Sequence, residues 1–264
     1  MITIKDYKKA SSLEEAYELN QKRTNRIIGG MLWTKMSSAN INTVIDISGL
    51  GLDKIEENDN EFIIGAMTTL RDIETHKGFD LYTDGAAKEA LHHIVGVQFR
   101  NLATVGGSVF GRYGFSDVIT LFLSLDTYVQ LYKGGIIPLA QFINMPYDRD
   151  ILVNIIVKKE MIRCAYKSVR ITKTDFPVLA CSAALTKSGV RMVFGARPGK
   201  AVLLTDAENI IDGEITEENA EQFAAFAKEN IKTGSNMRGS AEYRSHLVSV
   251  LAKRILMDMG GLEK

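Results

Sequence analysis

The sequence predicts an α+β fold, in which alternating strands and helices are followed by a block of strands and then by two helices. The chain has 264 residues, of which 45% are apolar, so it can bury the core of one large domain or of two smaller ones. In its first part, short strand patterns alternate with capped helix starts. From residue 151 on, four strand patterns precede two long helix patterns, which places a domain boundary near residue 158.

Cap and glycine signals define the elements in order. Ser12-Leu-Glu-Glu15 has the pattern of a capping box that opens a short helix, and Ile27-Ile28 predicts a strand that ends at Gly29-Gly30. Further strands are predicted at 44–47, 62–64 and 128–132, and helices from the capped start at 68–72, over 84–95 and over 117–125. The second part is predicted to contain strands at 151–157, 164–169, 179–185 and 190–194, and helices at 217–230 and 240–259.

Charge and apolar runs exclude several classes of partner. The 32 Lys and Arg residues balance 32 Asp and Glu residues, so no basic field attracts nucleic acid or anionic lipid. The N-terminus lacks the apolar core and the cleavage site of a signal peptide. The longest apolar stretch, 118–125, falls far short of the ~20 residues of a membrane span. We therefore expect a cytoplasmic protein that binds neither nucleic acid nor membrane.

The inventory of metal-binding side chains is poor. Cys164 and Cys181 are the two cysteines, too few for the four thiolates of an iron–sulfur cluster, and the usual zinc spacings are absent. His92 and His93 are adjacent, so we expect them to point to different sides of a helix. The sequence thus predicts no metal site.

The strongest local signal for ligand binding is the turn Thr104-Val-Gly-Gly-Ser108, with Asp117 downstream. Glycines without side chains let backbone N–H groups approach a phosphate, and the two hydroxyls add donors beside them. Asp117 could accept hydrogen bonds from ribose or ribityl hydroxyls. A plain glycine turn followed by a helix-capping aspartate is the alternative interpretation.

A second strand-to-glycine turn, Ile27-Ile-Gly-Gly-Met-Leu-Trp33, strengthens the case for a dinucleotide, whose two phosphates need donors from more than one strand end. The chain contains neither G-x-G-x-x-G nor G-x-x-x-x-G-K-[ST]. Pro198-Gly-Lys200 lacks the upstream glycine and the following hydroxyl of a P-loop. The sequence therefore favours neither a Rossmann fold nor a P-loop.

Several longer motifs resemble the flavoprotein subunits of the molybdenum hydroxylases, the family of the xanthine dehydrogenase FAD domain and the carbon monoxide dehydrogenase medium subunit. They are Ile64-Gly-Ala-Met-Thr-Thr-Leu-Arg-Asp-Ile-Glu74, Gly96-Val-Gln-Phe-Arg-Asn-Leu-Ala-Thr-Val-Gly-Gly-Ser108 and Ser116-Asp117. Two more segments, Thr43-Val-Ile-Asp-Ile47 and Gly239-Ser-Ala-Glu-Tyr-Arg-Ser-His-Leu247, extend the resemblance over nearly the whole chain.

The resemblance implies an FAD-binding domain over residues 1–157, with subdomains of about 1–55 and 56–157, and a smaller C-terminal α+β domain over 158–264. Asp117 becomes the contact to the polyol, and Gly114 stands where the family commonly has proline. The first pyrophosphate loop is assigned to Ile27, Ile28, Gly29, Gly30, Met31, Leu32 and Trp33, and the second to Thr104, Gly106, Gly107 and Ser108.

In the second part of the chain, the resemblance places Leu152 against the isoalloxazine ring and Lys167 within reach of the flavin. The alternatives are a strand-core leucine and a solvated lysine. Met31 and Leu32 depart from the family, which usually has a hydroxyl and then a polar residue there, so that only backbone groups could serve. Arg112 also replaces a smaller residue and either contacts the pyrophosphate or faces solvent.

The implied function is that of an electron-transfer subunit. A 2Fe-2S subunit and a molybdopterin-binding subunit on separate chains would deliver electrons to FAD, which passes them to NAD or another acceptor. This step requires no obvious side-chain acid or base, so no catalytic residue is assigned. A scaffold or assembly protein that has lost FAD is the rival, and a free-standing flavin oxidase is disfavoured because the C-terminal domain is short for a substrate cap.

Overall fold

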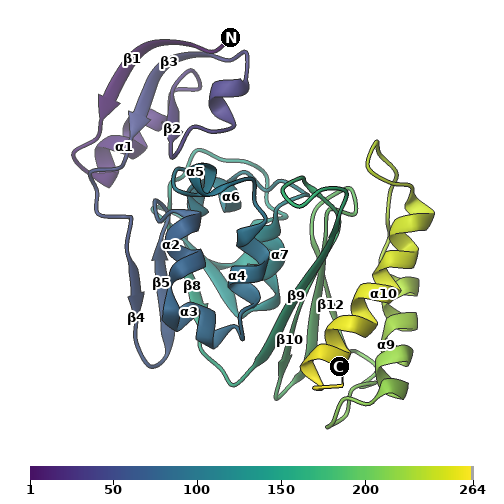
Figure 1. The fold of residues 1–264 in the computed structure, drawn as a ribbon. Helices are drawn as coiled ribbons and strands as arrows, with labels where there is room; N and C mark the ends of the chain where they lie inside the picture. Colours follow the sequence, from purple (N-terminus) through teal and green to yellow (C-terminus); the bar gives the residue numbers. More distant parts are fainter. Residues whose placement is uncertain (263–264) are drawn as a thin grey trace.

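The computed structural model describes residues 1–262, which fold around three sheets (Figure 1). The N-terminal sheet is parallel, with strand order β1 (Thr3–Lys9), β3 (Asn40–Asp46), β2 (Arg26–Ile28). Helix α1 (Leu13–Asn20) joins β1 to β2, and its Ala16 packs in a small apolar core with Ile45. A short 3₁₀ helix, η1 (Thr34–Met36), follows the glycine turn after β2.

The central sheet is antiparallel and has the order β4-β5-β8-β6-β7. Its strands are β4 (Ile55–Glu57), β5 (Glu61–Gly65), β6 (Thr127–Leu131), β7 (Gly135–Pro138) and β8 (Leu152–Lys158). The helices beside it are α2 (Leu70–Thr75), α3 (Lys77–Tyr82), α4 (Ala86–His92), α5 (Val97–Arg100), α6 (Val105–Phe110), α7 (Asp117–Ser124) and α8 (Leu139–Phe142).

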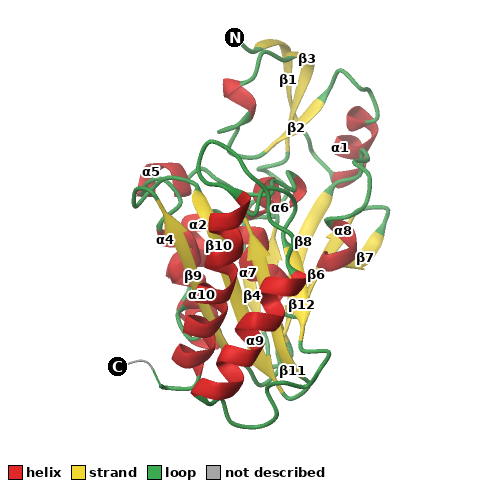
Figure 2. Cartoon of the chain, turned by 90° about the vertical axis from the view of Figure 1, so that its right-hand side faces the viewer, coloured by secondary structure: helices red, strands yellow, loops and turns green. Residues whose placement is uncertain are grey.

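The third sheet is also antiparallel, and two long helices cover one of its faces (Figure 2). Its order is β12 (Val202–Thr205), β11 (Gly189–Gly195), β10 (Pro177–Thr186), β9 (Arg163–Arg170), and the helices are α9 (Glu217–Asn230) and α10 (Ala241–Met259). On the other face lies α7, whose eight residues are all buried because it packs between this sheet and β6. This helix carries Asp117 at its first position.

The predicted α+β fold is confirmed, and the bounds of α9 are those predicted from the sequence. The capped helix start predicted at 68–72 is confirmed, and Thr69 and Asp72 form a capping box there at the start of α2. At α1 the pattern differs: Ser12 caps the helix by accepting from Glu15 N, but the Glu15 carboxylate accepts from Ser11 instead of Ser12.

The helix predicted over 84–95 is shorter, because left-handed backbone bounds it on both sides. Asp84 has φ of 49°, Gly85 has φ of 83°, and Val95 has φ of 51°. These values lie outside the helical region, so α4 is limited to Ala86–His92. The predicted domain boundaries at 55/56 and 157/158 fall within β4 and one residue before the end of β8. Among residues 1–262, no helix is long and apolar enough to cross a membrane.

Candidate cofactor site

Two adjoining cavities lie where the N-terminal sheet, α6 and α7 and the third sheet meet. The first has a volume of about 300 Å³ and the second about 430 Å³. They share the residues Gly29, Thr104, Gly107, Phe110, Gly111 and Tyr113. The combined space is therefore elongated, as an extended dinucleotide requires, with both predicted glycine turns at its middle.

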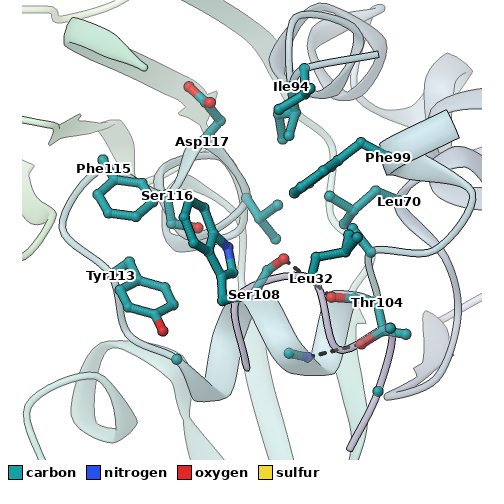
Figure 3. Close-up of a pocket in the computed structure, with 18 of the residues that line it drawn as sticks. Leu32, Leu70, Ile94, Phe99, Thr104, Ser108, Tyr113, Phe115, Ser116 and Asp117 are labelled. Carbon is teal, nitrogen blue, oxygen red and sulfur yellow. Dashed lines mark hydrogen bonds between the residues drawn. The ribbon is translucent and has the colours of Figure 1, made fainter. Parts of the chain in front are cut away.

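Most of the predicted site residues line this space, and Figure 3 shows the first cavity with Leu32, Thr104, Ser108 and Asp117 on its walls. Two of the predicted residues, Gly114 and Lys167, line neither cavity, and Leu152 lines only the second cavity. The remaining predicted residues lie on the first cavity (Gly30, Met31, Trp33), on the second (Ile27, Ile28, Gly106), or on both (Gly29, Gly107).

The first glycine turn presents unused backbone donors. Within residues 1–262, the N–H groups of Gly30, Met31, Leu32 and Trp33 donate to no protein acceptor. Met31 has φ of 58°, a left-handed conformation that is uncommon for a residue with a side chain. The turn lies tightly on its neighbour, since a Cβ at Gly30 would overlap the carbonyl oxygen of Leu102. Donors of this kind are suited to an anion.

The second glycine turn differs, because its N–H groups are already bonded within the protein. Val105 donates to Thr68 O at 2.9 Å, Gly106 to Ala66 O at 2.9 Å, and Gly107 to Thr104 Oγ1 at 3.2 Å. Ser108 donates through both its N–H and its hydroxyl to Thr104 O, each at 3.1 Å. The structure therefore does not support the prediction that these backbone groups cradle a phosphate. Gly107 instead offers a flat wall to both cavities.

Asp117 lies in a buried cluster and not alone on the cavity wall. Its Oδ1 accepts a hydrogen bond from Tyr166 Oη and another from Arg170 Nη2 at 2.6 Å. Arg170 also donates to Ser168 Oγ at 3.1 Å and to Asp175 O at 2.7 Å. Asp117 thus ties the start of α7 to β9 of the third sheet, which is a structural role that the sequence did not indicate.

Burial raises the pKa of the Asp117 carboxyl above its ordinary value, while Arg170 and Tyr166 act against this increase. Burial acts to lower the pKa of Arg170, but Asp117 and Tyr166 together outweigh burial and raise this pKa above its ordinary value. Arg170 lines the first cavity, so it brings a cation to the place where Lys167 was predicted to supply one.

Lys167 points away because side chains alternate along a strand. Tyr166, Ser168 and Arg170 share one face of β9, and Lys167 faces the opposite side, where its Nζ lies 3.2 Å from Asp258 of α10. Gly114 lies outside both cavities for a different reason. A Cβ there would overlap the backbone of Gly199, so this glycine allows two loops to pack against each other.

The prediction for the histidines is wrong. The His92 and His93 rings lie beside each other with their centroids 3.8 Å apart, and His93 Nε2 is 3.5 Å from the Glu89 carboxylate. His93 ends α4 as its C-cap, with φ of −89° and ψ of −2°, so helical spacing no longer directs its side chain. The potential ligand atoms of Glu89, His92 and His93 all lie within 4.8 Å of one another.

Four aromatic residues on the first cavity were not identified as a group from the sequence. The Trp33 ring centroid is 6.0 Å from that of Tyr113, 5.8 Å from Phe115 and 5.8 Å from Phe176. They come from three separate segments, so no local pattern joins them. The one local signal is the pair Tyr113 and Phe115, which flanks Gly114.

The residues present fit FAD. Unpaired donors at residues 30–33 suit a pyrophosphate, and glycines at the junction of the cavities leave room for a chain to pass. Aromatic and apolar side chains in the first cavity suit a flat ring. Arg23, Arg26 and Arg149 line the second cavity, which suits the charged half of a dinucleotide.

Known proteins are similar to this chain over nearly its whole length. A protein of Escherichia coli K12 called YgfM is 24% identical, covering 97% of this chain and 96% of its own length. The nicotine 6-hydroxylase medium subunit of Paenarthrobacter nicotinovorans is 27% identical, covering 96% of both chains. In fold, the chain is similar to quinoline 2-oxidoreductase from Pseudomonas putida 86, with a TM-score of 0.88 at 19% identity, covering 97% of both chains.

Two family models divide the chain between them. Residues 164–259 match the C-terminal domain of CO dehydrogenase flavoproteins. Residues 3–161 match the FAD-binding domain in molybdopterin dehydrogenase. Since this second match spans more than half of the sequence, the chain belongs to the FAD-binding family of the molybdopterin dehydrogenases, and FAD is its cofactor.

Proposed function

We propose that this chain is the FAD-binding electron-transfer subunit of a multi-subunit molybdenum hydroxylase. It would take electrons from iron–sulfur clusters on a partner and pass them to NAD or another acceptor. The observation that carries this proposal is the row of unpaired N–H groups at residues 30–33, which opens onto an elongated cavity. When bound, FAD supplies the chemistry, because it accepts electrons singly and releases two as a hydride.

The side chains of this site would bind and orient the cofactor. The first glycine turn would hold the pyrophosphate, with Gly107 as the flat wall beside it. Burial lowers the pKa of Arg149, and the nearby Arg26 and Arg23 lower it further. The second cavity thus has three arginines on its wall against the two carboxylates of Asp148 and Asp150. Such a site attracts a phosphate-bearing ligand and fixes which end of the cofactor enters it.

The other redox centres would lie on separate chains. Cys164 and Cys181, the two cysteines of the sequence, are both buried and cannot supply the four thiolates of a cluster. A 2Fe-2S subunit and a molybdopterin-binding subunit are therefore the proposed partners. The proposal includes a cytoplasmic location, which fits two cysteines that form no disulfide. It also includes the domain division at residues 157 and 158.

One observation favours a second candidate, a scaffold or assembly homologue without FAD. Met31 and Leu32 stand in the first glycine turn, and the Trp33 ring occupies part of the first cavity. Spectroscopy separates the two candidates, because a flavoprotein is yellow and its cofactor is released by denaturation. The absence of a His or Cys from both glycine turns predicts a noncovalent flavin.

The proposal is tested by titrating the purified protein with FAD. Gly107→Val places a side chain on the shared wall of both cavities, where a Cβ meets only Thr104 Oγ1 at 3.1 Å. We expect this variant to fold and to bind FAD at least about tenfold more weakly, a loss of about 1.4 kcal/mol. Gly49→Val is the matched control, since its Cβ meets only the flexible end of Lys9.

Wild-type protein that stays colourless and ignores excess FAD would contradict the flavoprotein proposal. The subunit assignment has its own test, in which tagged chain is coexpressed with an untagged cluster subunit and an untagged molybdenum subunit. We expect all three to copurify. We also expect the lone chain to leave purines, aldehydes and aromatic heterocycles unoxidised, and turnover of any of them by the lone chain would overturn the assignment.

A further inference from the structure

Two aromatic rings from distant parts of the chain face each other in the first cavity. Trp33 follows the first glycine turn, and Phe176 lies between β9 and β10. Their planes differ by 26° and their centroids lie 5.8 Å apart. Both side chains line the cavity, and Trp33 is 39% exposed, a large fraction for an indole ring surrounded by aromatic neighbours.

Phe176 is the fixed member of this pair. The Arg238 guanidinium lies over its ring at 4.9 Å, and Arg238 pairs with Asp175 at 3.1 Å. Phe115 packs against Phe176 with centroids 4.4 Å apart. These contacts hold the Phe176 ring from the side and from behind.

Trp33, by contrast, belongs to a loop that is held through its carbonyl groups, since Met31 O and Trp33 O accept from the N–H groups of Lys35 and Met36. The turn before it uses none of its N–H groups at residues 30–33 within the described chain, and Met31 is left-handed. Tyr113 and Phe115, which stack on each other with centroids 5.2 Å apart, lie beside Trp33, whose indole stays 39% exposed. A small displacement of the indole is therefore cheaper than a displacement of Phe176.

A flat ring between two aromatic planes needs a separation of about 7 Å, or twice the ~3.5 Å contact distance of carbon atoms. The Trp33 and Phe176 rings stack on each other with centroids 5.8 Å apart, so the indole must move away from Phe176 to admit a third ring. A flat ring held between Trp33 and Phe176 would replace their contact with each other, and it would bury more aromatic surface than it exposes.

The residues that line the two cavities indicate which half of the cofactor reaches the space between Trp33 and Phe176. The second cavity carries Arg23, Arg26 and Arg149, and suits the adenosine phosphate half. The wall of the first cavity is mainly apolar and includes Leu70 and Phe99 (Figure 3), and the Arg170 cation on this wall is paired with Asp117. We propose, on the basis of the proposed function, that Trp33 and Phe176 form an aromatic clamp that holds the isoalloxazine ring between them.

The clamp is tested with two ligands and two variants of Trp33. FAD carries the isoalloxazine ring, whereas ADP carries the adenine half and both phosphates without it. Trp33→Leu is expected to weaken FAD binding about tenfold, because the ring loses an aromatic stacking partner, and to leave ADP affinity unchanged. Trp33→Phe is expected to retain most of the FAD affinity. Phe226→Leu on α9 is the control outside the site.

Flavin emission gives a second readout that does not depend on activity. An indole in contact with isoalloxazine quenches its fluorescence, so FAD bound to Trp33→Leu should emit more strongly than FAD bound to the wild type. Equal emission together with equal FAD affinity would overturn the clamp and leave the proposed function intact. An equal loss of ADP and FAD affinity would also overturn it, because the indole would then support the turn as a whole. Failure of the wild type to bind FAD would overturn both.

Discussion

The two glycine turns pack against each other and line the same cavity, but they use glycine for different purposes. In the turn at residues 29–33, the backbone N–H groups from Gly30 to Trp33 have no acceptor among residues 1–262. In the turn at 104–108, the N–H groups from Val105 to Ser108 are all bonded to acceptors of the protein itself. The first turn can therefore donate to a ligand, whereas the second can only shape the wall against which the ligand lies.

The support beneath the turns differs as well. The second turn follows α5, where Arg100 makes two hydrogen bonds to Glu74, of 2.7 Å and 3.1 Å, with both side chains buried. Arg100 also donates to Ile94 O at 3.1 Å and so fixes a segment that lines the first cavity. The first turn rests on the backbone of Leu102 and on the side chain of Thr104. The second turn is thus the rigid wall of the site, and the first turn is the less restrained loop that carries the donors.

The largest expected effect comes from breaking this support. Glu74→Gln leaves Arg100 buried without its carboxylate, and we expect a loss of about 3 to 5 kcal/mol in the free energy of unfolding at neutral pH. Urea denaturation of the variant and of the exposed control Glu218→Gln measures the difference. A loss no greater than that of the control would show that the second turn does not depend on this ion pair.

The same ion pair predicts a pH dependence. Burial acts to raise the pKa of Glu74, but Arg100 and Arg71 outweigh it and hold the pKa below its ordinary value. A depressed carboxyl pKa stabilises the fold above the unfolded-state value of about 4.3, and this stability is lost as the pH falls through the folded-state pKa. The stability difference between wild type and Glu74→Gln should therefore shrink on acidification below about pH 4.

The sequence predicted the existence of both turns and their place beside a strand or helix, because glycine pairs and cap residues are local signals. It could not predict which turn had free donors. The acceptors for Val105 N and Gly106 N, which are Thr68 O and Ala66 O, lie about forty residues upstream, whereas Gly107 N and Ser108 N donate to Thr104 within the turn. Only the folded chain brings them together.

Strand register explains the other differences at the site. Lys167 of β9 was predicted to reach the flavin. Because side chains alternate along the strand, Arg170 faces the first cavity and Tyr166 faces Asp117, whereas Lys167 faces α10. A shift of one position reverses the face of every side chain in a strand. The aromatic cluster was missed because Trp33, Tyr113 and Phe176 come from three segments of the sequence.

A substitution in the donor turn should have the next largest effect. Gly30→Ala places a Cβ against the carbonyl oxygen of Leu102, so the turn must move and its N–H groups lose their common direction. Losing one or two charge-assisted hydrogen bonds costs about 1.5 to 3 kcal/mol each, so we expect FAD affinity to fall about 100-fold. Isothermal titration with FAD, with Gly49→Ala as the control, measures this. Unchanged affinity would mean that the pyrophosphate does not lie on this turn.

The smallest effect is expected in the wall turn, at a residue that the sequence identified as a phosphate donor. The Ser108 hydroxyl lies on the first cavity but donates to Thr104 O at 3.1 Å within α6, as the dashed line in Figure 3 marks. Its hydrogen is thus already used, and a serine that bonds back to its own helix contributes little to stability. Ser108→Ala should change the free energy of unfolding by no more than about 0.5 kcal/mol and the FAD affinity by less than about twofold. If the affinity instead fell as far as in Gly30→Ala, the hydroxyl would have to turn toward the cofactor on binding, and the two turns would both be donors.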